Sequence, residues 1–442
     1  MKKTILLSAL IALGIHVNAQ QRWTLRECID YAIAHNVNIL QAEISAKQSE
    51  VDANTAKWAR LPNLNAGGNQ SFNWGRTQTA IKDEDTGDYT TKYVDTSSRG
   101  TNMSLSTSIP LFTGFEIPNQ YALSKLNLKA ALADLQKAKE DLAINIASAY
   151  LQALYNKELH QVAVSQVELS KEQYERIESL ERLGKASVAE VAEAKSRVAQ
   201  DELNVVQTRN NYNLSILDLT QLIELETPEG FEIEEPDQAF VLNVLTPPDE
   251  IFSTAMMNKP AIKAAQARLE GSKHNIKIAQ SAYYPSLSLS GSLGTSYYST
   301  LNRTFSEQMG DNLSRYVGFS LNIPIFNRFA TRNRVRTAKL QRDNYALQLE
   351  NTKKTLYKEI QQAWYNATAA ESKYASSEAA TEASLASFEL TSKKYENGTA
   401  TAVAYNEAKQ NLMKAQSDEL QAKYEYIFRT KILDFYKGEE IQ

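Results

Sequence analysis

The sequence predicts a mainly α-helical protein with a membrane-embedded β portion, built from two internal repeats. Three observations predict this fold class: the two halves of the chain resemble each other, four segments alternate apolar and polar side chains, and long helical stretches lack Gly and Pro. With only 16 Gly and 10 Pro among 442 residues, helix breakers are scarce throughout.

Residues 1–19 have the features of a signal peptide. Two lysines precede an apolar run from Ile5 to Ile15, and residues 17–19 (VNA) form the small-x-small pattern of a signal-peptidase site. The run has about ten residues, too few to span a bilayer, and we expect no membrane helix later in the chain. Because Gln20 stands where a lipoprotein needs a cysteine, we expect no lipid anchor.

Composition argues against several classes of function. The formal net charge is −4, and removal of Lys2 and Lys3 lowers the 48 basic side chains to 46 against 52 acidic ones, so no nucleic-acid partner is expected. The single cysteine, Cys28, is expected to be a helix-packing residue, and the four histidines do not form a zinc motif. Residues 184–187 (GKAS) lack the other residues of a phosphate-binding loop, so we predict neither an enzyme nor a bound cofactor.

The two halves of the chain match over long stretches. Residues 32–64 match residues 255–287 at a shift of about 223 positions, and Gly184 later matches Gly398 at a shift of about 214. The shift changes within residues 78–100, which we expect to be a surface loop that is longer in the first half.

This match divides the chain into segments. After the leader, residues 20–225 are predicted to form the first structural repeat, and residues 249–442 the second. Residues 226–248 hold four of the ten prolines and several acids, so we interpret them as an equatorial connector that interrupts the helices.

Four segments have the pattern of amphipathic strands, with aromatic side chains near their ends. In each of them, apolar side chains such as Leu105 and Leu321 alternate with small polar ones such as Ser106 and Ser320. The alternative for a single segment of this kind is a half-buried strand in a soluble sheet. Four of them, each about ten residues long and flanked by long helices, instead favour strands that cross a membrane. The segments are residues 64–74, 101–111, 287–297 and 317–323.

Four strands cannot close a barrel, and an open sheet edge is not tolerated in lipid. We therefore expect several chains to pool their strands. Three chains would give about twelve strands, whereas two would give about eight, too few for a water-filled channel.

Long helices are predicted on either side of these strands. No Pro or Gly interrupts the chain between Pro118 and Leu183, and Leu128, Leu132 and Leu135 follow the four-three spacing of a coiled coil. The turn at Gly184 predicts a shorter return helix, and the second half repeats this order around Gly398. The other predicted helices are 24–60, 187–224, 248–282, 330–397 and 401–437.

This order of elements resembles the TolC-type outer-membrane efflux proteins over essentially the whole mature chain. Residues 110–114 (PLFTG) and 324–327 (PIFN) are similar to the family's Pro-aliphatic-Phe-Asp/Asn-Gly-Gly signature, although Phe115 replaces one glycine and Arg328-Phe329 replace both in the second copy. The turns at residues 182–188 and 395–403 resemble the Gly-x-x-Ser/Thr tips of the family.

The resemblance implies a homotrimer with a shared transmembrane β-barrel of four strands per chain and a long α-helical coiled-coil barrel. It implies an outer-membrane location in a Gram-negative bacterium, with the helices in the periplasm. The protein would then be the passive exit duct of a tripartite efflux or type I secretion system, linked to an inner-membrane pump. The alternative class is a periplasmic adaptor or coiled-coil spacer without a pore.

The resemblance also implies which residues act. A periplasmic adaptor protein would dock on the helical tips, and carboxylates one turn further along would narrow the aperture, although Ala404 replaces one expected acid. These acids could equally form a solvated helix face. The expected docking residues are Arg182, Leu183, Gly184, Ser187, Asn397, Gly398 and Thr401, and the aperture candidates are Glu407, Glu190 and Glu193.

Overall fold

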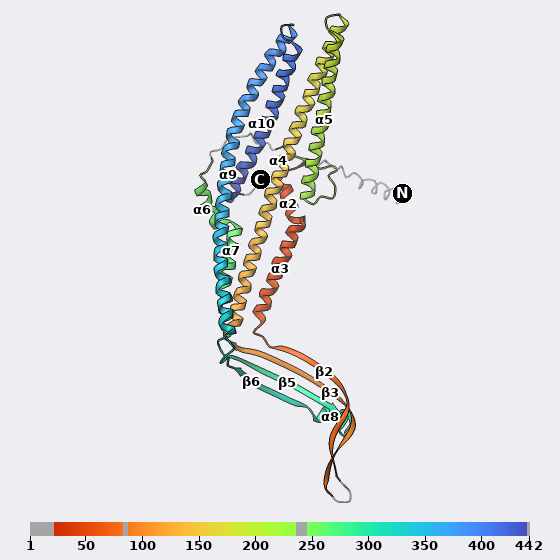
Figure 1. Cartoon of the computed structure of the whole chain (residues 1–442), viewed down its shortest axis with the longest axis vertical. Coiled ribbons are helices and arrows are strands. Elements are labelled where there is room, and N and C mark those ends of the chain that lie inside the picture. Colours follow the sequence, from red (N-terminus) through yellow and green to blue (C-terminus); the bar gives the residue numbers. More distant parts are fainter. Residues whose placement is uncertain (1–21, 83–86, 236–244, 440–442) are drawn as a thin grey trace, which may run out of the picture. The chain divides into compact units, whose positions relative to one another are not determined.

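The computed structural model describes residues 22–82, 87–235 and 245–439 (Figure 1). These residues form two compact units, and the long helices contribute to both. The helical unit comprises the described parts of Met1–Ala46, Ala130–Gln266 and Gln348–Gln442, and the sheet unit those of Lys47–Lys129 and Ala267–Leu347. The predicted signal peptide and part of the predicted connector lie outside the described residues.

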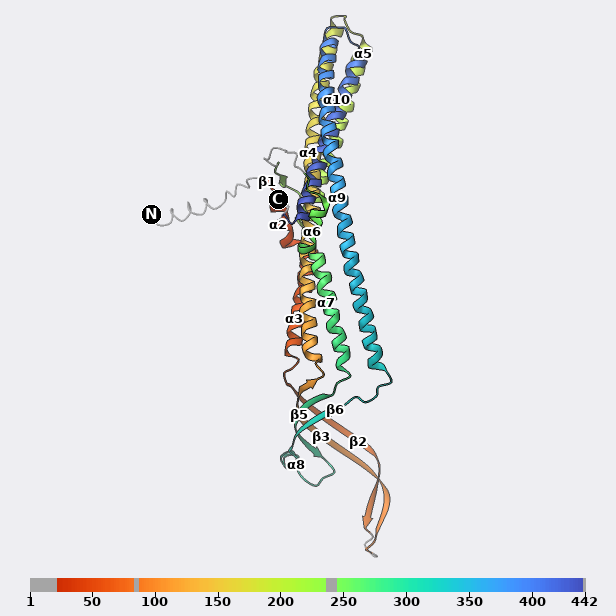
Figure 2. The same cartoon turned by 90° about the vertical axis from the view of Figure 1, so that its left-hand side faces the viewer.

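The long helices and their return helices lie where the sequence predicts them. Helices α4 and α9 each contain 67 residues, and each is followed by a Gly turn and a return helix of about half that length (Figure 2). Among the described residues, no helix is both long and apolar enough to cross a bilayer. The bounds are α4 Glu116–Arg182, α5 Val188–Leu222, α9 Ala330–Glu396 and α10 Ala402–Lys437.

The other two helical stretches are each broken once, so the prediction of single helices over 24–60 and 248–282 is wrong. The breaks fall at Asn36 and Lys259, where the backbone is extended. Lys259 precedes Pro260, whose ring disfavours helical backbone at the residue before it. The resulting helices are α2 Leu25–His35, α3 Val37–Trp58, α6 Pro248–Asn258 and α7 Pro260–Ser281.

Both breaks place a polar side chain at the end of a return helix. The Asn36 side-chain amide donates to the carbonyl oxygen of Leu222 at 3.3 Å, and Lys259 Nζ donates to that of Phe435 at 3.0 Å. The carbonyl groups at helix ends lack partners inside the helix. Each break therefore brings a side-chain donor to a carbonyl group near the end of a return helix.

A four-stranded antiparallel sheet in the order β2-β3-β5-β6 forms the core of the sheet unit. Its register pairs Leu105 with Leu293 and Ser106 with Ser292, and β6 places Ser320 opposite Ser288. At these positions apolar and polar side chains stay on separate faces, as the alternation predicts, whereas Arg315 lies opposite Leu293 and Arg99 opposite Phe72. The strands are β2 Asn63–Lys82, β3 Tyr89–Thr113, β5 Ser286–Tyr298 and β6 Ser314–Asn322.

A β-bulge changes one predicted facing. Pro110 pairs with Ser288 and Phe112 pairs with Leu287, so Leu111 is the extra residue. Strict alternation places Leu111 on the apolar face, whereas the bulge brings Phe112 to the position opposite Leu287.

The expected surface loop at residues 78–100 is mostly strand, and that prediction is wrong. β2 runs to Lys82 and β3 begins at Tyr89, so the two strands continue as a ribbon that β5 does not accompany. The hydroxyl groups of Thr77 and Thr96 lie 3.0 Å apart, and the Arg76–Asp95 ion pair spans 3.1 Å. β-Branched residues favour strand, and here they outweigh the turn-forming residues on which the loop prediction rests.

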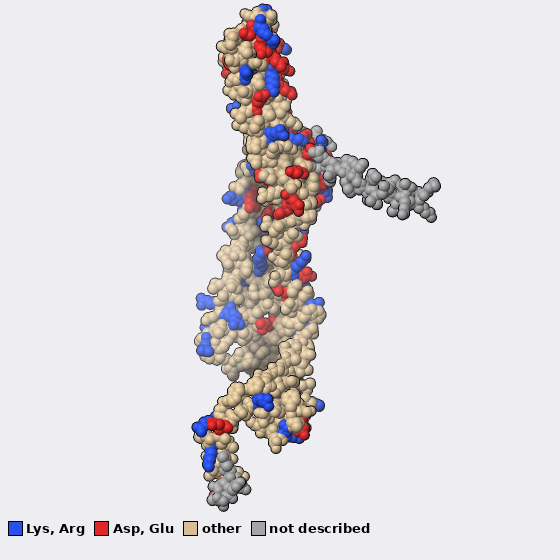
Figure 3. Space-filling model, turned by 90° about the vertical axis from the view of Figure 1, so that its right-hand side faces the viewer, with Lys and Arg blue, Asp and Glu red and all other residues tan. Residues whose placement is uncertain are grey.

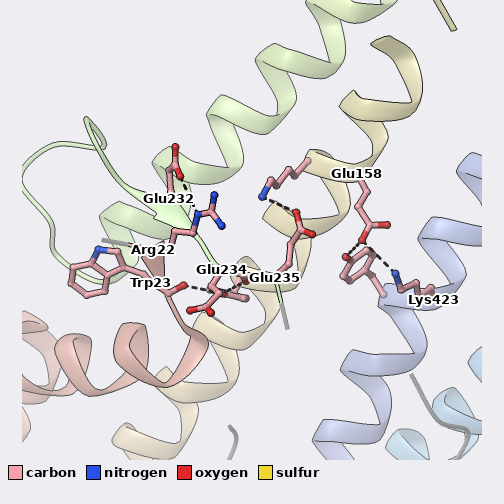
Figure 4. Close-up of polar contacts among 10 residues, drawn as sticks. Arg22, Trp23, Glu158, Glu232, Glu234, Glu235 and Lys423 are labelled. Carbon is pink, nitrogen blue, oxygen red and sulfur yellow. Dashed lines mark hydrogen bonds and ion pairs between the residues drawn. The ribbon is translucent and has the colours of Figure 1, made fainter. Parts of the chain in front are cut away.

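The buried core of the helical unit lies where β1 (Arg22–Trp23) pairs in parallel with β4 (Glu232–Ile233). The Tyr150 hydroxyl donates to the carbonyl oxygens of Trp23, at 2.9 Å, and Glu234, at 2.6 Å. Figure 4 labels Trp23 and Glu234 among the polar contacts of this region. Burial raises the pKa of Tyr150, so this hydroxyl stays protonated and tethers both strands to α4.

Candidate functional site

Two tight turns form the predicted tips, both in the helical unit. Gly184 and Gly398 have φ of 71° and 70°, a left-handed conformation that favours glycine. The amide of Lys185 donates to the Leu180 carbonyl oxygen, and that of Thr399 to the Lys394 carbonyl oxygen, both at 2.8 Å. These bonds close the ends of α4 and α9 in the same way. Arg182, Leu183 and Asn397 are exposed beside the two turns.

The return helices begin with different caps. Ser187 Oγ accepts from the Glu190 amide at 3.2 Å, and the Glu190 carboxylate accepts from the Ser187 amide at 2.7 Å. These hydrogen bonds lower the pKa of Glu190, since they stabilise its charged form. Thr401 also caps its helix, by accepting from the Ala404 amide at 3.2 Å, but the alanine side chain cannot reciprocate.

The two hairpins contact each other near their tips. Arg176 Nη2 donates to the Glu396 carbonyl oxygen at 3.1 Å, and its guanidinium also lies 3.8 Å from the Glu396 carboxylate. Beside this contact, within the second hairpin, the rings of Tyr395 and Tyr405 stack with their centroids 5.1 Å apart. Burial raises the pKa of both tyrosines, so this stacked pair is uncharged near neutral pH.

A buried lysine makes a second contact between the hairpins, and sequence reasoning did not identify it. Lys409 on α10 is only 3% exposed, and its Nζ donates to the Gln166 carbonyl oxygen at 3.3 Å and to Ser170 Oγ. Nζ also lies 3.3 Å from Asp201 Oδ2, which accepts from Ser170 Oγ. Burial lowers the pKa of Lys409, and Asp201 opposes that shift. We call Lys409, Ser170, Asp201 and Gln166 the lysine cluster.

The internal repeat contains an incomplete counterpart of this cluster. At the shift of about 214 positions, Lys195 matches Lys409, Ser384 matches Ser170 and Ala415 matches Asp201. Lys195 is exposed, and the counterpart of the acid is an alanine. The sequence signals for the cluster were therefore the matching lysines and the matching serines, and neither pair shows which lysine is buried.

A small cavity of about 30 Å³ lies beside the lysine cluster, large enough for a water molecule. Glu190 and Glu193 line it together with Arg197. Glu407 is exposed and does not line it. Two of the three aperture candidates thus lie together, and their role stays a prediction. Within the described residues, no group of three or more His, Cys, Asp or Glu side chains could hold a metal ion.

Comparison with known proteins identifies the family. The family model described as outer membrane efflux protein matches residues 28–223 and 251–434. The chain belongs to this family. The family places the efflux protein in the outer membrane of a Gram-negative bacterium, with its helices in the periplasm, as predicted.

Relatives of this efflux protein are distant in sequence. Toxin and drug export protein A of Aggregatibacter actinomycetemcomitans is 25% identical over 279 residues, which cover 62% of this chain and 56% of that one. Outer membrane protein TolC of Escherichia coli is 22% identical over 331 residues, covering 71% and 65%. The chain thus spans little more than half the length of the first of these relatives.

A solved structure agrees with the fold over most of the chain. The Campylobacter jejuni CmeC outer membrane channel superposes with a TM-score of 0.76 at 22% identity, covering 94% of this chain and 85% of that one. The predicted fold class, mainly α-helical with a membrane β portion, is therefore confirmed. None of these three comparisons tests the repeat boundaries or the tip residues, which stay predictions.

Proposed function

We propose that three copies of this chain form a passive exit duct in the outer membrane, recruited by a periplasmic adaptor protein and an inner-membrane pump. The duct would be part of a tripartite efflux or type I secretion system, and it would carry out no chemistry of its own. Small toxic molecules or polypeptides would leave the cell through it.

The sheet carries this proposal. Among the described strands, the edge strands β2 and β6 each have a partner on one side only, and one face of the sheet is mainly apolar while the other is mainly polar. In lipid, unpaired backbone groups cost several kcal/mol each, so each edge needs a strand from a neighbouring chain. A closed ring of such sheets would direct the apolar face to lipid and the serine-rich face to a water-filled lumen.

The tips supply the proposed contact with the adaptor. Leu183 and Val188 are exposed beside Gly184, and Val403 is exposed in the second hairpin. Apolar side chains that a folded chain leaves exposed in this way are typical of docking surfaces. In this proposal the acids Glu190, Glu193 and Glu407 lie close to the aperture between the tips.

Single-channel conductance of the purified full chain in a planar bilayer tests the proposal. We expect discrete conductance steps from a species that migrates as a trimer. Absence of conductance from correctly folded protein would favour the alternative, an adaptor or spacer without a pore.

Thiol cross-linking tests the trimer separately, in a background in which the native Cys28 is replaced by alanine. If α5 contacts α9 of the next protomer, as α10 contacts α4 within the chain, then Lys195→Cys with Ser384→Cys should cross-link between chains through a short bis-maleimide. Ser170→Cys with Lys409→Cys is the matched control and should cross-link within one chain. Only the first pair should yield covalent dimers and trimers on a denaturing gel.

A further inference from the structure

Basic side chains gather where the chain leaves β6 and enters α9. Arg328, Arg332, Arg336 and Lys339 are all exposed, and we call them the basic patch. In the part of the chain that the structure describes, no carboxylate pairs with any of the four. Figure 3 shows Lys and Arg side chains along this edge of the helices, with few acids beside them. Arg334 lies apart from the patch, because it lines a groove of about 820 Å³ with Glu116 and Asn275.

This arrangement is electrostatically unfavourable for the chain alone. The first turn of α9 holds no acid, although the positive end of a helix favours acids and disfavours cations. Arg332 and Arg336 are four residues apart, a spacing at which like charges repel. An anion bound outside the chain would relieve both effects.

The internal repeat shows that the fold does not require these cations. At the positions of α4 that match Arg332 and Arg336, the chain has Pro118 and Ala122, and Glu116 occupies the first turn of α4. Only Lys125 matches a patch residue, Lys339. The patch is therefore specific to the second half of the chain.

Backbone strain marks the same place. Arg328 and Phe329 have φ of 54° and 62°, in the left-handed region. These are the two positions at which the family signature has glycines. This conformation is disfavoured for a non-glycine residue. Phe115, which matches Phe329, also has it, with φ of 67°, whereas the residue that matches Arg328 is Gly114, so the strain at Arg328 is specific to the second half.

Apolar side chains precede the patch in the sequence. Ile325, Phe326 and Phe329 are 94%, 70% and 59% exposed, and they follow the apolar face of β6. Side chains on a helix lean toward its N-terminus, so Arg332 and Arg336 lean toward β6. Along the chain, an apolar strand is followed by aromatic residues and then by arginines. This matches the order of acyl chains, interface and phosphate groups in one leaflet of a membrane.

A second copy of the chain is a less suitable partner for the patch. Helix α4 already has a neighbour, α7, whose His274 lies 3.0 Å from Asn119. Even so, Pro118 and Lys125, which match Arg332 and Lys339, remain exposed. The matching face of α9 should therefore also stay open when a helix packs beside it.

We propose that the basic patch binds the phosphate groups of anionic phospholipids in the periplasmic leaflet of the outer membrane. The proposal rests on the proposed function only in that β6 crosses the membrane. Arginine suits this role because its planar guanidinium can donate two parallel hydrogen bonds to one phosphate.

Lipid binding by the purified full-length protein in detergent tests the proposal. The variant Arg332→Gln/Arg336→Gln is compared with Lys354→Gln/Lys358→Gln, which removes the same charge at the same spacing further along α9. We expect phosphatidylglycerol to bind about 30-fold more weakly to the first variant and unchanged to the second. Phosphatidylcholine and inorganic phosphate serve as the zwitterionic and free-anion probes.

Several results would overturn the proposal. Two of them concern binding: both variants bind phosphatidylglycerol equally well, or the patch variant loses affinity for inorganic phosphate as much as for phosphatidylglycerol. The other two concern the channel: the patch variant alone loses the trimer, or its ion selectivity changes while its lipid binding does not. In each case conductance of the unmodified protein would still report separately on the duct. Arg328→Gly gives a further check, since it should relieve backbone strain and raise thermal stability while weakening lipid binding.

Discussion

The return helices α5 and α10 occupy matching positions in the two halves of the chain but differ in their surroundings. On α10, Tyr405, Lys409 and Leu412 are buried. The matching side chains of α5 are more open, with Val191 and Val198 half-buried and Lys195 exposed. This face of α10 is thus covered inside the chain, whereas the matching face of α5 is left open to another surface.

The two helices also differ in whether their matching lysines have a carboxylate partner. Lys409 has Asp201 beside it, whereas the position that matches Asp201 in the second half is Ala415. A buried ammonium without a carboxylate is costly, so the α5 position can accept Lys195 only where water or another polar group reaches it. We infer that the contact of Lys409 inside the chain is more stable than the contact that Lys195 would make with a neighbouring chain.

Loss of the Asp201 carboxylate should have the largest effect on stability. Asp201→Ala would leave Lys409 buried without its carboxylate, and we expect a loss of about 3–5 kcal/mol of stability in the hairpins. The double variant Asp201→Ala/Lys409→Met should recover most of that loss, because it removes both charges. Thermal unfolding in detergent, followed by helical circular dichroism, measures both. A single variant as stable as the unmodified protein would show that the lysine cluster contributes little.

The two halves should respond alike in the sheet. Leu105→Arg in β3 and Leu321→Arg in β6 should each weaken assembly by about 2–4 kcal/mol near the membrane midplane, because both lie on the apolar face. Ser106→Arg and Ser320→Arg, on the polar face, should be tolerated. The yield of heat-resistant trimer on a gel gives the comparison, and equal damage on both faces would contradict the assigned facing.

The tip turns should also respond alike. Gly184→Val and Gly398→Val should each cost about 1–2 kcal/mol, since a side chain is disfavoured at positive φ. No atom within 4 Å would obstruct the added Cβ, so the cost is confined to the backbone. We expect the trimer to assemble while efflux of a fluorescent substrate falls. Unchanged efflux in both variants would remove the tips from the mechanism.

Acid should loosen α5 but not α10. The lowered pKa of Glu190 means that its capping bonds add stability above the usual value of 4.5, and that this contribution is lost as the pH falls through the lower folded value. Hydrogen exchange in the first turn of α5, corrected for intrinsic rates, should rise below pH 4.5. In Glu190→Gln this extra rise should disappear, and α10, which begins Thr401-x-x-Ala404, serves as the internal control.

Much of the fold could be predicted because its signals are local and periodic. Helices α4 and α9 follow from long stretches without Gly or Pro, and the sheet follows from strict alternation. The break at Lys259 was also predictable from Pro260. The bulge at Leu111 was not, because register depends on the partner strand rather than on the strand's own sequence.

The candidate site was less accessible to sequence reasoning. The Ser187 capping box could be predicted, since its two residues are three apart. The lysine cluster joins α4, α5 and α10, and nothing local distinguishes Lys409 from Lys195. Its burial depends on which helix packs against it, and that is decided by tertiary structure.

The pairing of β3 with β5 sets an order for biogenesis. Gly100 lies opposite Tyr298 and Arg22 lies opposite Glu232, so neither pair can form until more than half of the polypeptide has been synthesised. During that interval the apolar residues of β2 and β3 have no complete sheet to join, and exposed strands of this kind aggregate. We therefore expect the first hairpin to be prone to aggregation until the strands of the second half are available to pair with it.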